Sequence, residues 1–157
     1  MRHEHANDEI FLQTGGTELL DRIEPLWLQL RQHHADLSTV WRASVLDSSF
    51  DNRRAQLLTK ASEGLLVVLA SSGGADIGYC VSSIDQGVGE VDSIYVAAAA
   101  RRQGIGQMMM SPTMAWFKEK QATSIIVGVF DGNDAAESFY NRYGFRRRSV
   151  RLQVVND

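Results

Sequence analysis

Residues 94–106 read Ile-Tyr-Val-Ala-Ala-Ala-Ala-Arg-Arg-Gln-Gly-Ile-Gly, and this stretch decides the fold prediction. A β-branched and aromatic run ends at Val96, and a long helical pattern begins at Ile105. Two arginines at a helix start oppose the positive end of the helix dipole, and two glycines weaken the first turn. A phosphate would remove the conflict, because free backbone N–H groups, the dipole and the arginines would all attract it. We therefore expect an anion-binding loop between a strand and a helix.

The bulk composition is that of an ordinary globular chain, with 44% apolar and 22% charged residues. A length of 157 residues fits a single domain over residues 1–157 with a sizeable core. The net charge of −3 argues against nucleic acid or an anionic membrane as partner, so any phosphate must be held locally. Cys80 is the only cysteine, which excludes an internal disulfide and a cysteine-based zinc site, so we expect no metal. A polar N-terminus without a signal-peptide core, together with apolar runs too short to span a bilayer, predicts a cytoplasmic protein.

Periodicity outward from the loop predicts a mixed α/β order. Strands are expected at 10–13, 65–70, 77–84, 90–96, 124–130 and 145–155, and helices at 17–37, from Ser49 to before Gly64, at 105–120 and at 133–143. Residues 71–76 have the composition of a hairpin turn, so the strands from 65 to 96 form an antiparallel meander. Pro25 should start or kink its helix, and Pro112 argues against an unbroken run from 105 to 120. Gly144 stands where a left-handed helix cap is needed.

Three phosphate-binding designs contain glycines spaced like Gly104 and Gly106. A Walker loop needs Gly-Lys-Ser/Thr, which the chain lacks, and the dinucleotide fingerprint needs a third small residue where Met109 stands. The third design, Arg-x-x-Gly-x-Gly five residues after a strand, fits Arg101, Gly104 and Gly106. A glycine-rich turn that only starts a helix would leave the arginines unexplained.

The loop resembles the acetyl-CoA-binding motif of the GNAT N-acetyltransferase superfamily. A second block, Asn-Asp-Ala-Ala-Glu-Ser-Phe-Tyr-Asn-Arg-Tyr-Gly-Phe at 133–145, resembles that family's Asn-x-x-Ala-x-x-Phe-Tyr-x-x-x-Gly-Phe signature. The likeness is strong over residues 64–150 and rests only on helix order before them. It implies an α/β fold with a mixed, mostly antiparallel central sheet, flanked by helices and splayed at the acetyl-CoA site.

The resemblance also implies roles for individual residues. Backbone N–H groups of the loop would hold the CoA pyrophosphate, the main chain of Ile94 and Val96 would pair with the pantetheine arm as an added strand, and Asn133 would bond near that arm. Tyr140 would stand beside the thioester sulfur. The loop residues implied in cofactor binding are Arg101, Arg102, Gln103, Gly104, Ile105, Gly106 and Gln107.

Acyl transfer to an amine imposes its own chemistry. A protonated amine has no lone pair, so a base or a desolvated pocket must take its proton. Glu90 and Asp92 alternate with their neighbours and should share one strand face; Glu90 has the spacing of a catalytic glutamate in the histone-modifying branch of the family. We expect Glu90 as base, with Asp92 or a water chain as alternatives, and Tyr140 as acid for the departing thiolate. The simpler interpretations are that Tyr140 packs its ring with a solvated hydroxyl and that the two carboxylates are solvated side chains on a strand.

Other polar groups have less specific interpretations. His33 and His34 follow the first helical pattern, where the family walls its acceptor site, but such histidines more often face water. Basic residues on the last expected strand favour a solvated edge or the rim of a homodimer; they are Arg146, Arg147, Arg148 and Arg151. The sequence thus predicts an acetyl-CoA-dependent N-acetyltransferase acting by direct attack on an unidentified amine. The alternative is a catalytically silent acyl-CoA-binding regulatory module.

Overall fold

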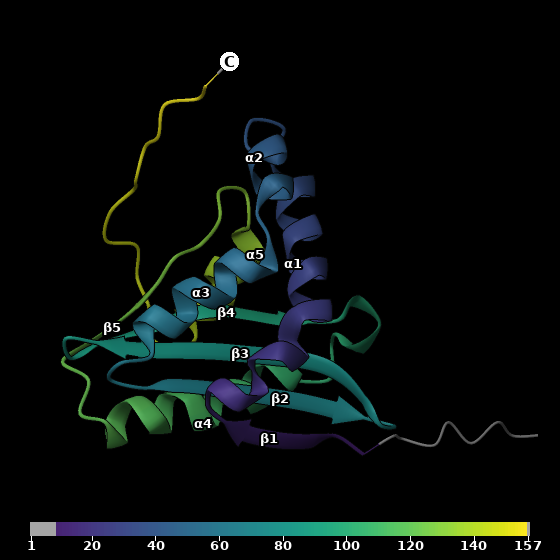
Figure 1. Ribbon diagram of the computed structural model, residues 1–157, viewed down its shortest axis with the longest axis vertical. Coiled ribbons are helices and arrows are strands. Elements are labelled where there is room, and N and C mark those ends of the chain that lie inside the picture. Colours follow the sequence, from purple (N-terminus) through teal and green to yellow (C-terminus); the bar gives the residue numbers. More distant parts are fainter. Residues whose placement is uncertain (1–8, 157) are drawn as a thin grey trace, which may run out of the picture.

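The computed structural model describes residues 9–156 (Figure 1). Within these residues, five strands, five α-helices and two 3-10 helices follow one another in a mixed α/β order. The strands are β1 Phe11–Gly15, β2 Leu65–Ser72, β3 Ala75–Asp85, β4 Val88–Val96 and β5 Ser124–Val127. The helices are η1 Thr17–Ile23, α1 Glu24–Leu37, α2 Arg42–Asp47, α3 Phe50–Lys60, η2 Ala98–Ala100, α4 Ile105–Glu119 and α5 Asp134–Asn141.

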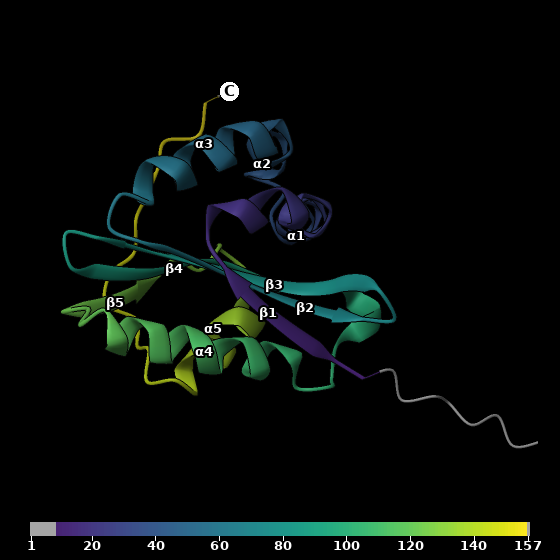
Figure 2. The ribbon, with the colours of Figure 1, turned by 60° about the horizontal axis from the view of Figure 1, so that its bottom comes forward.

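The strands form one sheet in the order β1-β2-β3-β4-β5. The first four are antiparallel to their neighbours, and β5 runs parallel to β4. Helices α1 to α3 cover one face of this sheet, and α4 and α5 cover the other (Figure 2). Each face carries its own apolar cluster, because alternate strand residues point to opposite sides. The expected mostly antiparallel sheet flanked by helices is confirmed.

Local sequence signals explain several element boundaries. Ser49 accepts a hydrogen bond from the Asn52 backbone N–H at 3.1 Å, so it caps α3 as expected. Pro25 stands in the first turn of α1, where a missing N–H costs nothing. Gly144 has φ of +90°, the left-handed conformation expected where the chain leaves α5.

The helical pattern at 17–37 divides into η1 and α1, and Pro25 stands at the start of α1, as expected. Three secondary-structure expectations were wrong. Pro112 lies inside α4, which continues through it, and the predicted strand at 124–130 ends at Val127. The predicted strand at 145–155 pairs with no strand among the described residues; the segment is exposed and runs away from the sheet (Figure 1). That alternating pattern is typical of a strand, but a strand also needs a neighbour for its backbone groups.

Two irregularities in β4 shape the region near the predicted loop. Val81 pairs with Ser93 but Ser82 pairs with Val91, so Asp92 is the extra residue of a β-bulge. In addition, β5 pairs with β4 only as far as Val91 and then stops. Among the described residues, positions 92–96 therefore have a sheet neighbour on the β3 side only, which leaves an opening in the sheet at the place where the resemblance implied a splay.

None of the helices formed by residues 9–156 has the length and apolar character needed to cross a bilayer.

Candidate active site

The predicted anion-binding loop lies between η2 and α4, directly after β4. No backbone N–H from Arg102 to Gln107 donates a hydrogen bond to another described residue; the first such bond at this end runs from Met108 N to Gly104 O, at 2.9 Å. The first turn of α4 also contains no acidic residue and no side-chain cap. Unsatisfied N–H groups at the positive end of a 15-residue helix make a site for an anion.

The two loop glycines have different structural reasons. Gly104 has φ of +74°, and a Cβ built there would meet no atom within 4 Å. Gly106 instead allows close packing, since a Cβ there would lie 3.2 Å from the ring of Phe139 on α5. Gly104 therefore supplies backbone conformation, and Gly106 brings α5 against the start of α4.

The loop arginines do not act alike. Arg101 turns back to the end of β4, where its Nε donates to the Val96 carbonyl at 3.1 Å and its guanidinium lies 5.3 Å from the centre of the Tyr95 ring. Arg102 is exposed and adopts φ of +66°, an uncommon value for a residue other than glycine. Gln103 and Gln107 are exposed, whereas the Ile105 side chain is buried beneath the loop.

The second sequence block forms α5, beside the splay. Asn133 caps this helix, accepting a hydrogen bond from the Ala136 N–H at 3.2 Å. Ile94 and Val96 direct their side chains into the α4-side cluster, which leaves their main chain at the edge that β5 does not cover. Ile94 and Val96 thus lie at the open edge of the sheet, and Asn133 lies at the start of α5.

Tyr140 is 5% exposed and packs its ring against Phe139 and Phe145, with centroid separations of 5.4 and 5.7 Å. Burial raises the pKa of its hydroxyl well above the ordinary value, so the group stays protonated and able to donate. Nearby, burial raises the pKa of the Cys80 thiol to about 11. Cys80 is therefore a neutral thiol at physiological pH and a poor nucleophile.

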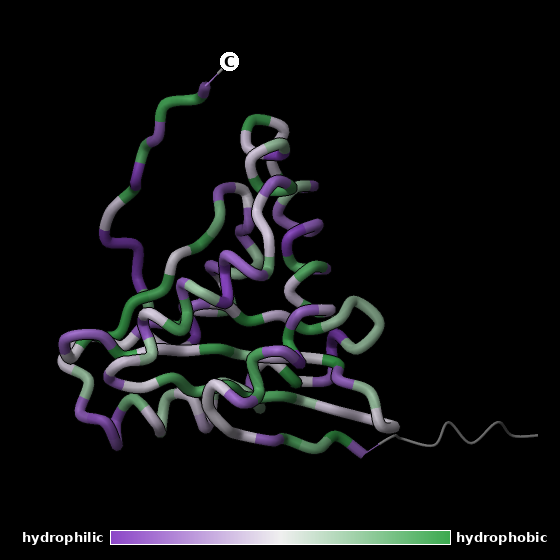
Figure 3. The backbone as a smooth tube through the Cα atoms, viewed as in Figure 1, coloured by the Kyte–Doolittle hydropathy of each residue, from purple (hydrophilic) through white to green (hydrophobic). Residues whose placement is uncertain are grey.

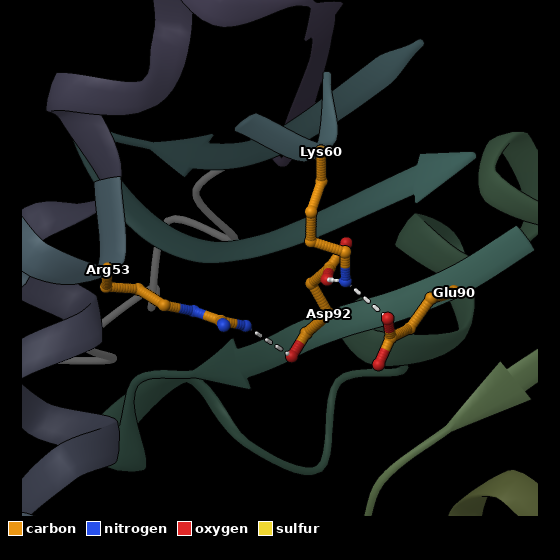
Figure 4. A network of polar contacts seen from close by, with 4 residues as sticks. All are labelled: Arg53, Lys60, Glu90 and Asp92. Atoms are coloured by element: carbon orange, nitrogen blue, oxygen red, sulfur yellow. Dashed lines mark hydrogen bonds and ion pairs between the residues drawn. The ribbon is translucent and has the colours of Figure 1, made fainter. Parts of the chain in front are cut away.

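Glu90 and Asp92 lie on the face of β4 covered by α3, and both are ion-paired with Lys60 at the end of that helix (Figure 4). The two carboxylates do share a face, as expected. Their exposure differs: the Glu90 side chain is 32% exposed and the Asp92 side chain 1%. Burial alone would lower the pKa of Lys60, but the hydrogen bonds and negative charges of Asp92 and Glu90 raise it above the ordinary value. Oδ2 of Asp92 is buried without any hydrogen-bond partner among the described residues.

A pocket of about 460 Å³ opens beside this cluster. Asp92 and Ser93 of β4 form its floor, Phe130 lies just after β5, and α1 and α3 supply most of the wall. Because Asp92 and Phe130 lie on opposite sides of the splay, the pocket reaches the opening in the sheet. Glu90 is not among the lining residues.

His34 lies in the pocket wall, with its ring stacked on Phe130 at a centroid distance of 4.8 Å. Burial, with a smaller contribution from the charge of His33, lowers the pKa of His34 to about 4. His34 is therefore neutral at physiological pH, and so it is a wall residue and not a cation for substrate binding.

Three pocket or cluster residues escaped the sequence analysis: Arg31, Arg53 and Lys60. Each is one of many charged residues on a helical surface, and no spacing in the sequence links Lys60 to a carboxylate thirty or more positions away. Within residues 9–156, the His, Cys, Asp and Glu side chains form no group of three or more that could hold a metal ion.

Comparison with known proteins agrees with this geometry. Residues 27–145 match the model of the acetyltransferase (GNAT) family. The PaiA N-acetyltransferase of Thermoplasma acidophilum, solved in complex with coenzyme A, superposes with a TM-score of 0.73 at 17% identity, covering 91% of this chain and 93% of that one. The aminoglycoside N-acetyltransferase AAC(6')-Iy, also solved with CoA, gives 0.66 at 16% identity, covering 96% of each chain. The ribosomal-protein-alanine N-acetyltransferase of Brucella melitensis gives 0.61 at 14% identity, covering 92% of this chain and all of the other. At these identities the likeness establishes the shared fold.

Proposed function

The chain belongs to the acetyltransferase (GNAT) family, and we propose that it transfers acetyl from acetyl-CoA to a primary amine by direct attack in a ternary complex. One observation carries the proposal. The uncovered edge of β4 has a loop of unsatisfied N–H groups at one end and the pocket lined by Asp92 and Ser93 at the other. A cosubstrate with a pyrophosphate and an extended amide arm fits the loop and edge, and an acceptor fits the pocket.

Acetyl-CoA would lie with its pyrophosphate on the backbone N–H groups of residues 102–107. Its pantetheine arm would pair with the main chain of Ile94 and Val96, as a strand added to a sheet edge. The Arg101 side chain donates a hydrogen bond to the Val96 carbonyl, so it would have to release that contact for pairing at Val96. Asn133, whose side-chain oxygen caps α5, would contact the same arm through its NH2 group.

The proposed reaction has one bond formed, one bond broken and two proton transfers. The amine nitrogen attacks the thioester carbonyl carbon, a C–N bond forms, and the C–S bond breaks. The proton lost by the amine goes to a carboxylate, and Tyr140 donates its proton to the departing thiolate sulfur. The neutral, buried Tyr140 hydroxyl supports the acid role, while the buried neutral Cys80 thiol argues against an acyl-cysteine intermediate.

For the proton acceptor we propose the Glu90–Asp92 pair with its shared Lys60. Asp92 lines the pocket and would contact the amine of the acceptor. Glu90 is the more exposed member of the pair and would release the proton to solvent. Glu90 was the base expected from the sequence, and it stays in the proposal as the outer member of the pair. Backbone N–H groups at the bulge would be close enough to the reacting carbonyl to serve as oxyanion donors.

A homodimer and a cytoplasmic location complete the proposal. The segment from Ser149 to Val154 alternates polar and apolar residues and is exposed (Figure 3). Leu152 is 90% exposed, and β5 is an edge strand with one side unpaired. An exposed strand-like segment and an open edge on the same chain support pairing between two copies.

The decisive experiment measures release of the CoA thiol from acetyl-CoA with a panel of primary amines, beside the melting temperature with and without acetyl-CoA. We expect acetyl-CoA to raise the melting temperature by mass action and at least one amine to release thiol. Stabilisation without thiol release for any amine would favour the alternative, a silent acyl-CoA-binding module. No stabilisation at saturating acetyl-CoA would contradict both.

A further inference from the structure

Two residues that line the pocket, Arg31 and Asp92, each carry a buried polar atom without a partner, and these atoms have opposite requirements. Oδ2 of Asp92 is an acceptor without a donor, and Nε of Arg31 is a donor without an acceptor. They are the only buried side-chain nitrogen or oxygen atoms in the described part of the chain that lack a hydrogen bond. A buried polar atom left unpaired costs free energy, so two in one pocket indicate a ligand that completes both.

Arg31 is held in place for such a contact. Its Nη1 donates to the Ser48 carbonyl at 2.7 Å, and its guanidinium lies over the ring of Trp27, 5.9 Å from the ring centre. These contacts orient the guanidinium, and neither of them uses the Nε atom. None of the carboxylates placed in the structure forms an ion pair with Arg31.

Arg53 adds a second unneutralised cation. It donates to the Asp92 backbone carbonyl at 3.0 Å (Figure 4), and its guanidinium too has no ion pair with a carboxylate in residues 9–156. The pocket and the adjoining cluster contain three cations and two carboxylates, so their net charge is +1. The groups are Arg31, Arg53, Lys60, Glu90 and Asp92. A simple cationic amine would enter against this excess, whereas an acceptor that carries its own anion would not.

We propose, on the basis of the acetyltransferase function above, that the acceptor is a small amino acid-like molecule whose carboxylate binds Arg31 and Arg53 and whose amino group contacts Asp92. The amino group then lies at the bulge, on the side of the pocket that reaches the splay. A volume of about 460 Å³ holds a compact molecule of this kind and is at the lower end of ligand pockets. His34, which is uncharged at physiological pH, and Trp27 also line the pocket.

The test compares ω-amino acids of increasing chain length with their carboxamides, which keep the amine and lose only the negative charge. We expect one length to be acetylated best, with kcat/KM about 10-fold or more above that of its amide, as for a charge-assisted contact. Arg31→Gln should reduce the acid-to-amide ratio towards one while leaving the rate with the amide within a few-fold. Arg54→Gln removes the same charge from α3 at a residue that is ion-paired to Asp21 outside the pocket, and should keep the preference.

Binding provides a readout that does not depend on turnover or on one variant. With CoA present, the preferred acid should raise the melting temperature of the parent protein and of Arg54→Gln, and its amide should not. Equal rates and equal stabilisation for acids and amides would overturn this inference but leave the acetyltransferase function intact. If acids stabilise the complex but no amine releases thiol, the pocket assignment holds and the proposed catalysis fails. If Arg31→Gln does not fold, Arg31→Lys, which keeps the charge and loses the fork, should give an intermediate ratio.

Discussion

Tyr140 is the residue on which the proposed leaving-group step depends. Tyr140→Phe keeps the ring that packs against Phe139 and Phe145 and removes only the hydroxyl. We expect kcat to fall about 10²- to 10⁴-fold, the usual contribution of general acid–base catalysis, with little change in acetyl-CoA affinity. Steady-state kinetics and a CoA titration measure the two effects. An unchanged kcat would make Tyr140 a packing residue.

The two carboxylates on Lys60 can be separated by matched amide substitutions. Asp92→Asn and Glu90→Gln should both lower the rate at neutral pH and steepen its rise with pH, because only amine already deprotonated in solution could react. The effect should be larger for Asp92→Asn, since Asp92 lines the pocket and Glu90 does not. A pH–rate profile like that of the parent in both variants would exclude the pair as proton acceptor. A raised KM at constant kcat would instead identify a substrate anchor.

His34 should make the protein sensitive to acid. Its pKa is about 4 in the folded protein and near 6.5 in an unfolded chain, so the unfolded state gains the proton first as the pH falls. Its contribution to stability is complete above about pH 6.5 and is lost progressively towards pH 4. His34→Phe preserves stacking on Phe130 and should flatten the fall of the melting temperature over that range. His33→Phe, one position earlier, is the control; identical slopes in all three proteins would refute the assignment.

At the scale of elements, the start of α4 should bind the pyrophosphate through its backbone. Gly104 can be substituted without a clash, and its φ of +74° is tolerated by both asparagine and aspartate. Gly104→Asn should retain most of the acetyl-CoA-induced rise in melting temperature, while Gly104→Asp should lose it, because only the latter adds a negative charge. The two variants should melt alike without ligand. Equal responses to acetyl-CoA would place the pyrophosphate elsewhere.

The bulge in β4 is the second element that positions chemistry. Without the extra residue, strict alternation would place Asp92 and Ser93 on opposite faces. With the extra residue, Asp92 contacts Lys60, and the Ser93 hydroxyl lies 3.1 Å from the Tyr79 hydroxyl. Both contacts are on the face of the sheet that α1 to α3 cover. The bulge therefore concentrates polar groups at the point where β5 ends.

At the scale of the whole molecule, the C-terminal segment should join two copies. Arg147 is ion-paired with Glu137 on α5, but from residue 148 to 156 no hydrogen bond reaches the rest of the described chain. Leu152→Asp, in the middle of the apolar row, should therefore convert a dimer to a monomer. Gln153→Asp introduces the same group on the opposite side and should not. Light scattering of the purified proteins measures the mass; a monomeric parent would contradict the dimer directly.

The sequence alone determined the local structure around the loop at residues 101–107. Strand, loop and helix near residue 96 follow from local rules, and so do the cap at Ser49 and the left-handed Gly144, because backbone conformation depends on near neighbours. Those same rules overestimated two strands. Residues 128–130 and 145–155 have suitable side chains, but within residues 9–156 no strand pairs with them, and a local pattern carries no information about strand partners.

Only the tertiary structure decided which charges meet. Lys60 joins Glu90 and Asp92 because α3 packs across β4, and Arg31 and Arg53 reach one pocket from two helices. It also separated the two carboxylates, leaving one half-exposed and burying the other at a bulge whose register depends on β3. Side-chain burial and pairing arise from contacts between segments tens of residues apart, so periodicity identified the candidates and folding selected among them.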